Sequence, residues 1–180
     1  SNGEEALSAM KAQPYDLGVI QGIPYFYRQF GYEYALPLHL THKLGLSQIP
    51  DLKEGQSETF AVRPMAPEDI PQALAWSQAA AKKLCLHLVR QTEGWLYPEQ
   101  ISDENPDHVW SYAVEEGSRG VGYFRVHKKK DDLIPCCEMS EMSYLATLAA
   151  FRHLKCLAQE QSAQGVSLQG PTQSNAVKVA

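Results

Sequence analysis

Hydrophobic residues recur with helical spacing in two parts of the chain. In the first, apolar side chains from Ile70 to Leu84 share one face of a helix. Pro67 and the two acidic residues after it fit the first turn of this helix, because a missing backbone N–H costs little there and negative charge is favoured. In the second, residues 147–161 place Leu148, Phe151 and Leu154 along one side, and a glycine follows. The pattern predicts two amphipathic helices.

Alternating or continuous apolar runs lie before, between and after these two helices. Residues 60–65 precede the first helix, and residues 108–114 and 121–126 flank a Glu-Glu-Gly-Ser-Arg-Gly turn, which predicts a hairpin. Residues 134–144 predict a third strand, and residues 166–168 begin one more after the second helix. The expected order is strand, helix, three antiparallel strands, helix, strand.

The first 57 residues carry a different pattern. Residues 4–12 have helical composition, and residues 15–21 predict a buried strand. An aromatic helix is expected after Pro24, with Gly31 as its left-handed end, and residues 32–38 alternate like a half-buried strand. A polar link follows up to Thr59, and its most linker-like run places a domain boundary near Ser57.

Composition and charge narrow the class of protein. Hydrophobic residues make up 44% of the 180, and charged residues 21%, which is typical of soluble globular proteins. The net charge of −5 argues against a nucleic-acid or anionic-membrane surface. No apolar run approaches the roughly 20 residues of a membrane span, and no signal peptide opens the chain. A cytoplasmic protein without a nucleic-acid or membrane partner is expected.

Cysteine and histidine spacings give no metal site. The four cysteines contain no Cys-x-x-Cys pair, so reduced thiols are expected, and adjacent Cys136 and Cys137 fit two opposite faces of a strand better than a strained disulfide. The His39/His42 and Cys85/His87 pairs each supply two ligands, whereas zinc needs three or four. We expect no bound metal.

The aromatic helix carries a family resemblance. The segment resembles the one that follows the fifth strand of the GNAT N-acetyltransferase superfamily, and it reads Phe26-Tyr27-Arg28-Gln29-Phe30-Gly31-Tyr32. The longer segment from Gly22 to Glu33 resembles the corresponding segment of a predicted-acetyltransferase subgroup. Some members of that subgroup carry two GNAT-like domains in tandem. The order of elements from residue 60 onward also resembles the GNAT layout.

The resemblance implies a fold and a domain organisation. The fold is α/β (α+β), with a mixed, largely antiparallel sheet flanked by helices. Residues 1–57 would be the C-terminal part of a first GNAT domain, and residues 58–180 a second GNAT-like domain. The chain is therefore interpreted as a fragment of a tandem-domain protein.

The resemblance also implies a reaction. The parent protein would transfer an acetyl group from acetyl-CoA to the amine of a small molecule or peptide. Tyr27 matches the tyrosine that acts as general acid, and a phenol of pKa about 10 can protonate a departing thiolate whose thiol has pKa about 8.5. By the same resemblance, Ile23, Phe26 and Tyr27 contact the cofactor. A core aromatic with a hydrogen-bonded hydroxyl is the structural alternative for Tyr27.

Two departures from the family pattern leave other functions open. The family's Gln/Arg-x-x-Gly-x-Gly/Ala loop binds pyrophosphate, but residues 144–149 contain no glycine, and no such loop precedes Tyr15. An Asn common in the family is replaced by a Gly-Ile-Pro turn. Gly117, Gly120 and Gly122 have nearly the right spacing but join two strands. A second domain without cofactor binding is expected.

The rival hypothesis is a non-catalytic GNAT-like module for packing, dimerisation or ligand binding. An unrelated α/β domain also stays open, because most of the chain carries only pattern-level evidence. An unpaired strand edge would favour a homodimer formed by strand exchange.

Overall fold

The computed structural model describes residues 5, 8–9, 11–12, 19–20, 25–35, 41–84, 87–170 and 174–180. The chain divides into two compact units, residues 1–38 and residues 39–180. Each unit is described by itself.

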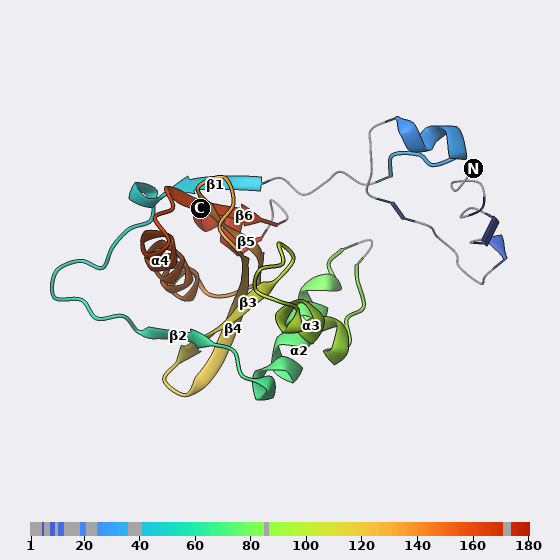
Figure 1. Ribbon diagram of the computed structural model, residues 1–180. Coiled ribbons are helices and arrows are strands. Elements are labelled where there is room, and N and C mark those ends of the chain that lie inside the picture. The colour runs from blue at the N-terminus through green and yellow to red at the C-terminus, as the bar shows by residue number, and fades with distance from the viewer. Residues whose placement is uncertain are drawn as a thin grey trace. The chain divides into compact units, whose positions relative to one another are not determined.

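Six strands of the larger unit form one sheet in the order β1-β6-β5-β4-β3-β2 (Figure 1). Every neighbouring pair is antiparallel except β5 and β6, which are parallel. The strands are β1 (Thr41–Gly45), β2 (Phe60–Pro64), β3 (Val109–Glu116), β4 (Arg119–His127), β5 (Leu133–Met139) and β6 (Gly165–Gln169). The predicted mixed, largely antiparallel sheet and its central hairpin are confirmed.

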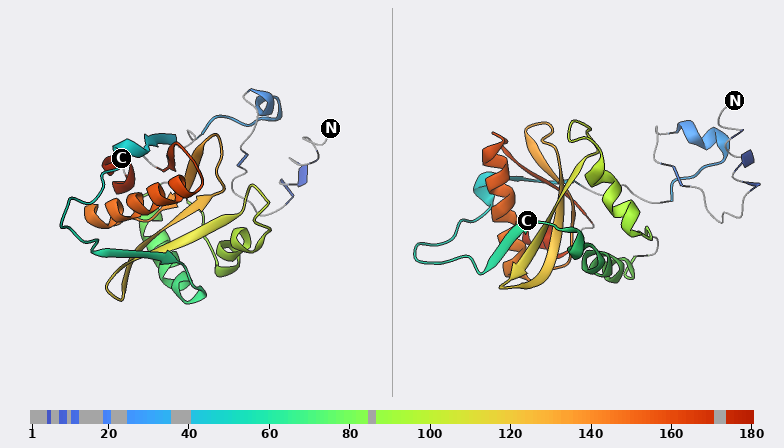
Figure 2. Two further views of the ribbon diagram at one scale, coloured as in Figure 1. Left: turned by 60° about the vertical axis from the view of Figure 1, so that its left-hand side comes forward. Right: turned by 60° about the horizontal axis from the view of Figure 1, so that its bottom comes forward.

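Helices cover both faces of this sheet. One face carries α2 (Ile70–Ala81), which follows the short helix η3 (Pro67–Asp69), together with α3 (Thr92–Gln100). The other carries the long helix α4 (Tyr144–Glu160), and the right-hand view of Figure 2 shows the sheet between the two groups. Helix α5 (Asn175–Val179) packs against α4. The two helices expected from the hydrophobic spacing are thus confirmed.

Two hydrophobic clusters reflect these two faces. The larger lies between α4 and the sheet, and the smaller lies under α2 and α3. Neighbouring residues of β4 point to opposite faces, so Phe124 belongs to the larger cluster and Tyr123 to the smaller. Both side chains are almost completely buried. The position of a β4 side chain in the sequence therefore decides which helices it meets.

Strands β1 and β2 are consecutive in the chain but lie at opposite edges of the sheet. The connection between them contains η2 (Leu46–Gln48) and then residues 49–59, and it runs past the outer side of α4 (Figure 1). We call residues 49–59 the strap. The polar link expected between residues 39 and 59 therefore contains a strand and a short helix, and residues 41–45 complete the sheet of the larger unit. The assignment of residues 1–57 to a first GNAT domain stays a prediction.

The smaller unit contains the short aromatic helix η1 (Phe26–Phe30). Gly31 ends it with φ of 86°, in the left-handed conformation expected for this glycine. Residues 32–35 form no strand, so that part of the prediction is wrong, and residues 36–38 lie outside the described residues. Of the strand expected over residues 15–21, only residues 19–20 are described, and they are not in a strand.

Candidate functional site

The parallel strands β5 and β6 separate before β5 ends. Their pairing runs from Leu133 opposite Gly165 to Cys136 opposite Leu168. Residues 137–139 continue along β4 only, and the chain then enters α4 through residues 140–143. Ligands of α/β proteins commonly bind beyond the carboxyl ends of parallel strands, so this region is a candidate ligand site.

The connection from β5 to α4 is closed by the protein's own side chains. Met142 is buried, and it lies so close to Gly122 that a β-carbon added there would clash with its side chain. The Ser143 hydroxyl caps α4 by accepting a hydrogen bond from the Ala146 N–H. Asn175 of α5 donates its side-chain N–H to the Met142 carbonyl over 3.1 Å, and its backbone N–H to a Glu141 carboxylate oxygen over 3.3 Å. The segment therefore joins α4 to α5.

A polar cluster lies around Glu138 of β5, on the face of the sheet that α2 and α3 cover. The Tyr123 hydroxyl donates to Glu138 Oε1 over 2.6 Å, and Arg90 Nη1 donates to Glu138 Oε2 over 2.6 Å. Arg125 Nη1 lies 3.7 Å from the same Oε2. Burial, with the Glu138 charge beside it, raises the pKa of Tyr123, and burial raises the pKa of the neighbouring Cys137 thiol to about 11.

Arg125 joins this cluster to α3. Its Nε donates to Ser111 Oγ over 3.0 Å, and its Nη2 donates to the Trp95 carbonyl over 3.1 Å and to Glu99 Oε1 over 3.4 Å. Its guanidinium also lies 4.3 Å from the centre of the Trp95 ring, a cation–π contact. We call Arg90, Tyr123, Arg125, Glu138, Glu99, Ser111 and Trp95 the Glu138 cluster.

Its charges balance, since two arginines face two carboxylates. Both oxygens of Glu138 accept hydrogen bonds from other members of the cluster, so this carboxylate is already engaged within the protein. The cluster is therefore better suited to holding α3 and the α2–α3 connection on the sheet than to abstracting a proton. Sequence reasoning missed it, although a glutamate inside the otherwise apolar β5 and an arginine in the apolar run of β4 were signals.

The structure describes two of the three residues expected to contact a cofactor. Phe26 and Tyr27 lie side by side in η1, with ring centroids 5.1 Å apart in an edge-to-face arrangement. Phe26 is exposed and Tyr27 half-buried, and Tyr27 also lies edge-on to Tyr32 at 6.2 Å. Ile23 lies outside the described residues. The Glu138 cluster belongs to the other unit.

The start of α4 follows an acidic residue and a buried apolar side chain. A pyrophosphate site needs free backbone N–H groups and positive potential at a helix N-terminus. Here the carboxylate of Glu141 lies just before α4 and Met142 fills the space over Gly122. The exposed side chains of Tyr144 and Leu145 flank the first turn of α4.

The residues that the structure describes contain no group of three or more His, Cys, Asp or Glu side chains that could hold a metal ion. Among them, no helix is both long and apolar enough to cross a membrane.

Comparisons with known proteins give a likeness in fold. No protein-family model matches the sequence, and no curated protein sequence matches it significantly. A GCN5-related N-acetyltransferase from Anabaena variabilis has a TM-score of 0.65 and 16% identity, over 97% of this chain and 44% of that one. A probable N-acyltransferase from Enterococcus faecalis has a TM-score of 0.65 and 14% identity, over 93% of this chain and 41% of that one.

A GCN5-related N-acetyltransferase from Kribbella flavida has a TM-score of 0.59 and 15% identity, over 89% of this chain and 37% of that one. The chain thus spans less than half the length of each of these three proteins. The mixed sheet, the helices on its two faces and these likenesses together show that the chain has the fold of the GCN5-related N-acetyltransferase (GNAT) superfamily.

Proposed function

We propose that this chain is part of an N-acetyltransferase that uses acetyl-CoA, in which Tyr27 acts as general acid and residues 39–180 form a supporting GNAT-fold module. The acceptor in this proposal is the amine of a small molecule or peptide. The proposal rests on the aromatic motif of residues 26–32 and on the acetyltransferase fold of the chain.

The contact of Met142 with Gly122, together with the Glu141 carboxylate, carries the second half of the proposal. This arrangement supports a module that does not hold acetyl-CoA at the start of α4. It favours a role in packing or ligand binding for residues 39–180. A homodimer through the outer edge of β1 or β2 is compatible with this role, because among the described residues each of these strands pairs on one side only.

Calorimetry with acetyl-CoA tests the supporting role. We expect residues 139–146 to give no saturable binding of acetyl-CoA at micromolar concentrations. A Glu141→Gln variant, which removes the negative charge before α4, should leave this result unchanged because residues 144–149 still contain no phosphate-binding glycine. Binding with 1:1 stoichiometry that Glu141→Gln strengthens would show that α4 holds the cofactor, against the proposal.

A Tyr27→Phe variant tests the general acid. In an acetyl-transfer assay on the longest natural protein that contains this chain, we expect kcat to fall about 100-fold with little change in KM, since general acid catalysis contributes roughly 10²–10⁴-fold. Tyr25→Phe is the matched control, because Tyr25 lies beside η1 and its side chain is 73% exposed. Equal kcat values for the Tyr27→Phe and Tyr25→Phe variants would remove Tyr27 from the mechanism.

A further inference from the structure

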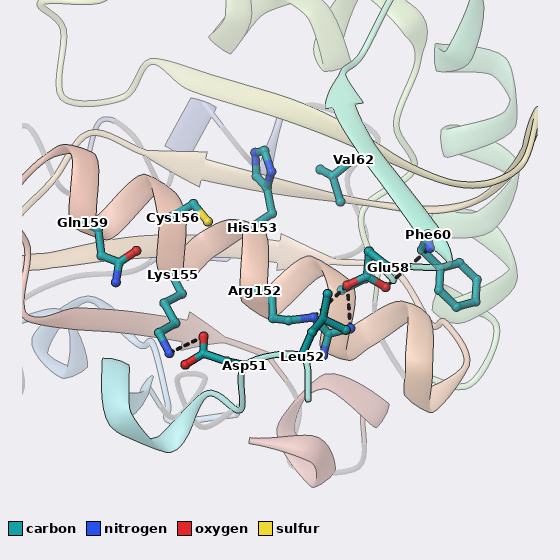
Figure 3. Close-up of a pocket in the computed structure, with 11 residues that line it drawn as sticks. Asp51, Leu52, Glu58, Phe60, Val62, Arg152, His153, Lys155, Cys156 and Gln159 are labelled. Atoms are coloured by element: carbon teal, nitrogen blue, oxygen red, sulfur yellow. Dashed lines mark hydrogen bonds and ion pairs between the residues drawn. The ribbon is translucent and has the colours of Figure 1, made fainter. Parts of the chain in front are cut away.

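A cavity of about 360 Å³ lies between α4, β2 and the strap (Figure 3). Its apolar wall comes from Leu52, Phe60, Val62 and Ala149, and His153 and Cys156 of α4 also line it. The volume falls in the range of about 300–1,000 Å³ that is usual for small-molecule sites. The cavity is on the α4 face of the sheet, whereas the Glu138 cluster is on the face of α2 and α3.

Two ion pairs fasten the strap over this cavity (Figure 3). Arg152 donates from Nε and Nη2 to Glu58 Oε2 at 2.7 and 2.6 Å, and Lys155 Nζ lies 2.7 Å from Asp51 Oδ1. Lys155 also donates to the Ile49 carbonyl over 3.1 Å. Between Asp51 and Glu58 every residue of the strap is exposed, so these two ion pairs hold the ends of an arch.

The two partners of each ion pair differ in burial. The side chains of Arg152 and Lys155 are 18% and 13% exposed, whereas those of their partners Glu58 and Asp51 are 31% and 77% exposed. The cations therefore belong to the wall of the cavity, on a long helix that packs on the core, and the carboxylates come to them from a surface segment. A largely buried cation needs an anionic partner, and a surface carboxylate can be replaced by another anion at little cost.

We propose that this cavity is a binding site for a small carboxylate with a short apolar tail, and that Asp51 and Glu58 occupy its cation positions when no ligand is bound. The ligand's carboxylate binds Arg152 or Lys155, and its tail lies against Phe60, Val62 and Ala149. Arg152 Nη1 makes no hydrogen bond with the described residues, so it offers a donor before either ion pair breaks. The site is independent of Tyr27 and of the proposed acetyl transfer.

Calorimetric titrations with sodium hexanoate and with hexanamide test the site. The two probes have the same tail, and only hexanoate carries a charge. We expect hexanoate to bind more tightly than hexanamide to the full chain. The Asp51→Asn/Glu58→Gln variant should bind hexanoate about five to ten times more tightly than the unmodified chain, because no carboxylate of the strap then competes for Arg152 and Lys155.

Two further variants separate this proposal from a general charge effect. Glu54→Gln is the matched control, because Glu54 lies on the exposed part of the strap and forms no ion pair with the described residues, and it should leave the affinity unchanged. Arg152→Gln should lower hexanoate affinity at least fivefold in the Asp51→Asn/Glu58→Gln background. Equal binding of hexanoate and hexanamide, or an equal gain from Glu54→Gln, would overturn the proposal.

Hydrogen exchange of the unmodified chain gives a reading that needs no variant. Hexanoate displaces the strap carboxylates in this proposal, so amide exchange in residues 51–58 should rise with hexanoate and stay constant with hexanamide. Unchanged exchange at saturating hexanoate would contradict displacement of the strap.

Discussion

Tyr123 and Glu138 lie on neighbouring strands of the sheet, and the Tyr123 hydroxyl donates a hydrogen bond of 2.6 Å to Glu138 Oε1. Tyr123 is 1% exposed, so its hydroxyl has no access to bulk water. The bond therefore fixes the carboxylate that also holds Arg90. Residue 90 lies in the connection between α2 and α3, so this one carboxylate joins that connection to β5.

Removing the Tyr123 hydroxyl should destabilise the larger unit. We expect Tyr123→Phe to lower the free energy of unfolding by about 2 kcal/mol, because a hydrogen bond to a charged group is lost while the ring still packs on Trp76 and Trp95. Urea denaturation measures the change. Tyr97→Phe, at an exposed position of α3, should change it by less than about 0.5 kcal/mol. Equal effects of the two substitutions would argue against the role given to the hydroxyl.

The contact between Gly122 and Met142 predicts a steric effect. A β-carbon at position 122 would clash with the Met142 side chain, so Gly122→Ala should cost about 1–3 kcal/mol of unfolding free energy. Met142→Ala removes the two nearest of these contacts and leaves the Ser140 hydroxyl, 2.6 Å from the added β-carbon, so the double variant should lose less than the sum of the two single changes. Thermal and urea unfolding give the values.

Gly94 provides the control for this pair. A β-carbon there meets no atom within 4 Å, and Gly94 lies inside α3, so Gly94→Ala should be neutral or stabilising by up to about 1 kcal/mol. Additive losses for Gly122→Ala and Met142→Ala would mean that the two residues do not compete for space.

The three cysteines that the structure describes should differ in reactivity. Burial raises the pKa of Cys137 to about 11, so below pH 9 its thiolate is a small minority, and iodoacetamide should modify it slowly. Cys156 is exposed and should react first. The rate at Cys137 should rise about tenfold for each pH unit until about pH 11, provided the fold persists. Peptide mapping after timed labelling separates the sites, and equal rates at Cys137 and Cys156 at pH 8 would contradict this order.

The elements that the sequence predicted have regular hydrophobic spacing. Helices α2 and α4 and the hairpin of β3 and β4 each bury one face or alternate strictly, and each was expected within a few residues. In contrast, α3 contains Gly94 and Pro98, which normally interrupt helices, and no apolar stripe marks it because one residue, Trp95, supplies its buried contact. Tertiary packing around the Trp95 ring, rather than local pattern, specifies this helix.

Strand β1 was missed for a related reason. Of its five residues only Leu44 is buried, so no alternation marks it. Its strand conformation depends on hydrogen bonds to β6, whose paired residues lie 120–128 positions later in the sequence. The Glu138 cluster is likewise assembled from residues far apart in the chain. The absence of a phosphate-binding glycine at the start of α4, by contrast, is read directly from residues 144–149.

His153 should make the stability of the larger unit depend on pH. Its ring packs near Tyr112 and Phe124, with centroids 5.0 and 6.0 Å away, and its Nε2 is buried without a hydrogen-bond partner among the described residues. Burial lowers its pKa from 6.5. The unfolded chain therefore binds a proton more readily than the folded one as the pH falls below 6.5. The contribution of the neutral His153 to stability is present above pH 6.5 and is lost below it, by at most about 1.4 kcal/mol for each pH unit.

A His153→Phe variant removes this titration while keeping a ring at the site. The difference in unfolding free energy between the unmodified chain and the variant should then shift in favour of the variant as the pH falls from 7 to 5. His87→Phe, at an exposed position, controls for the loss of a histidine. Urea denaturation at several pH values measures the slopes. The same slope for the unmodified chain and for His153→Phe would mean that other groups cause the acid sensitivity, and that His153 gains a proton as easily in the folded protein as in the unfolded chain.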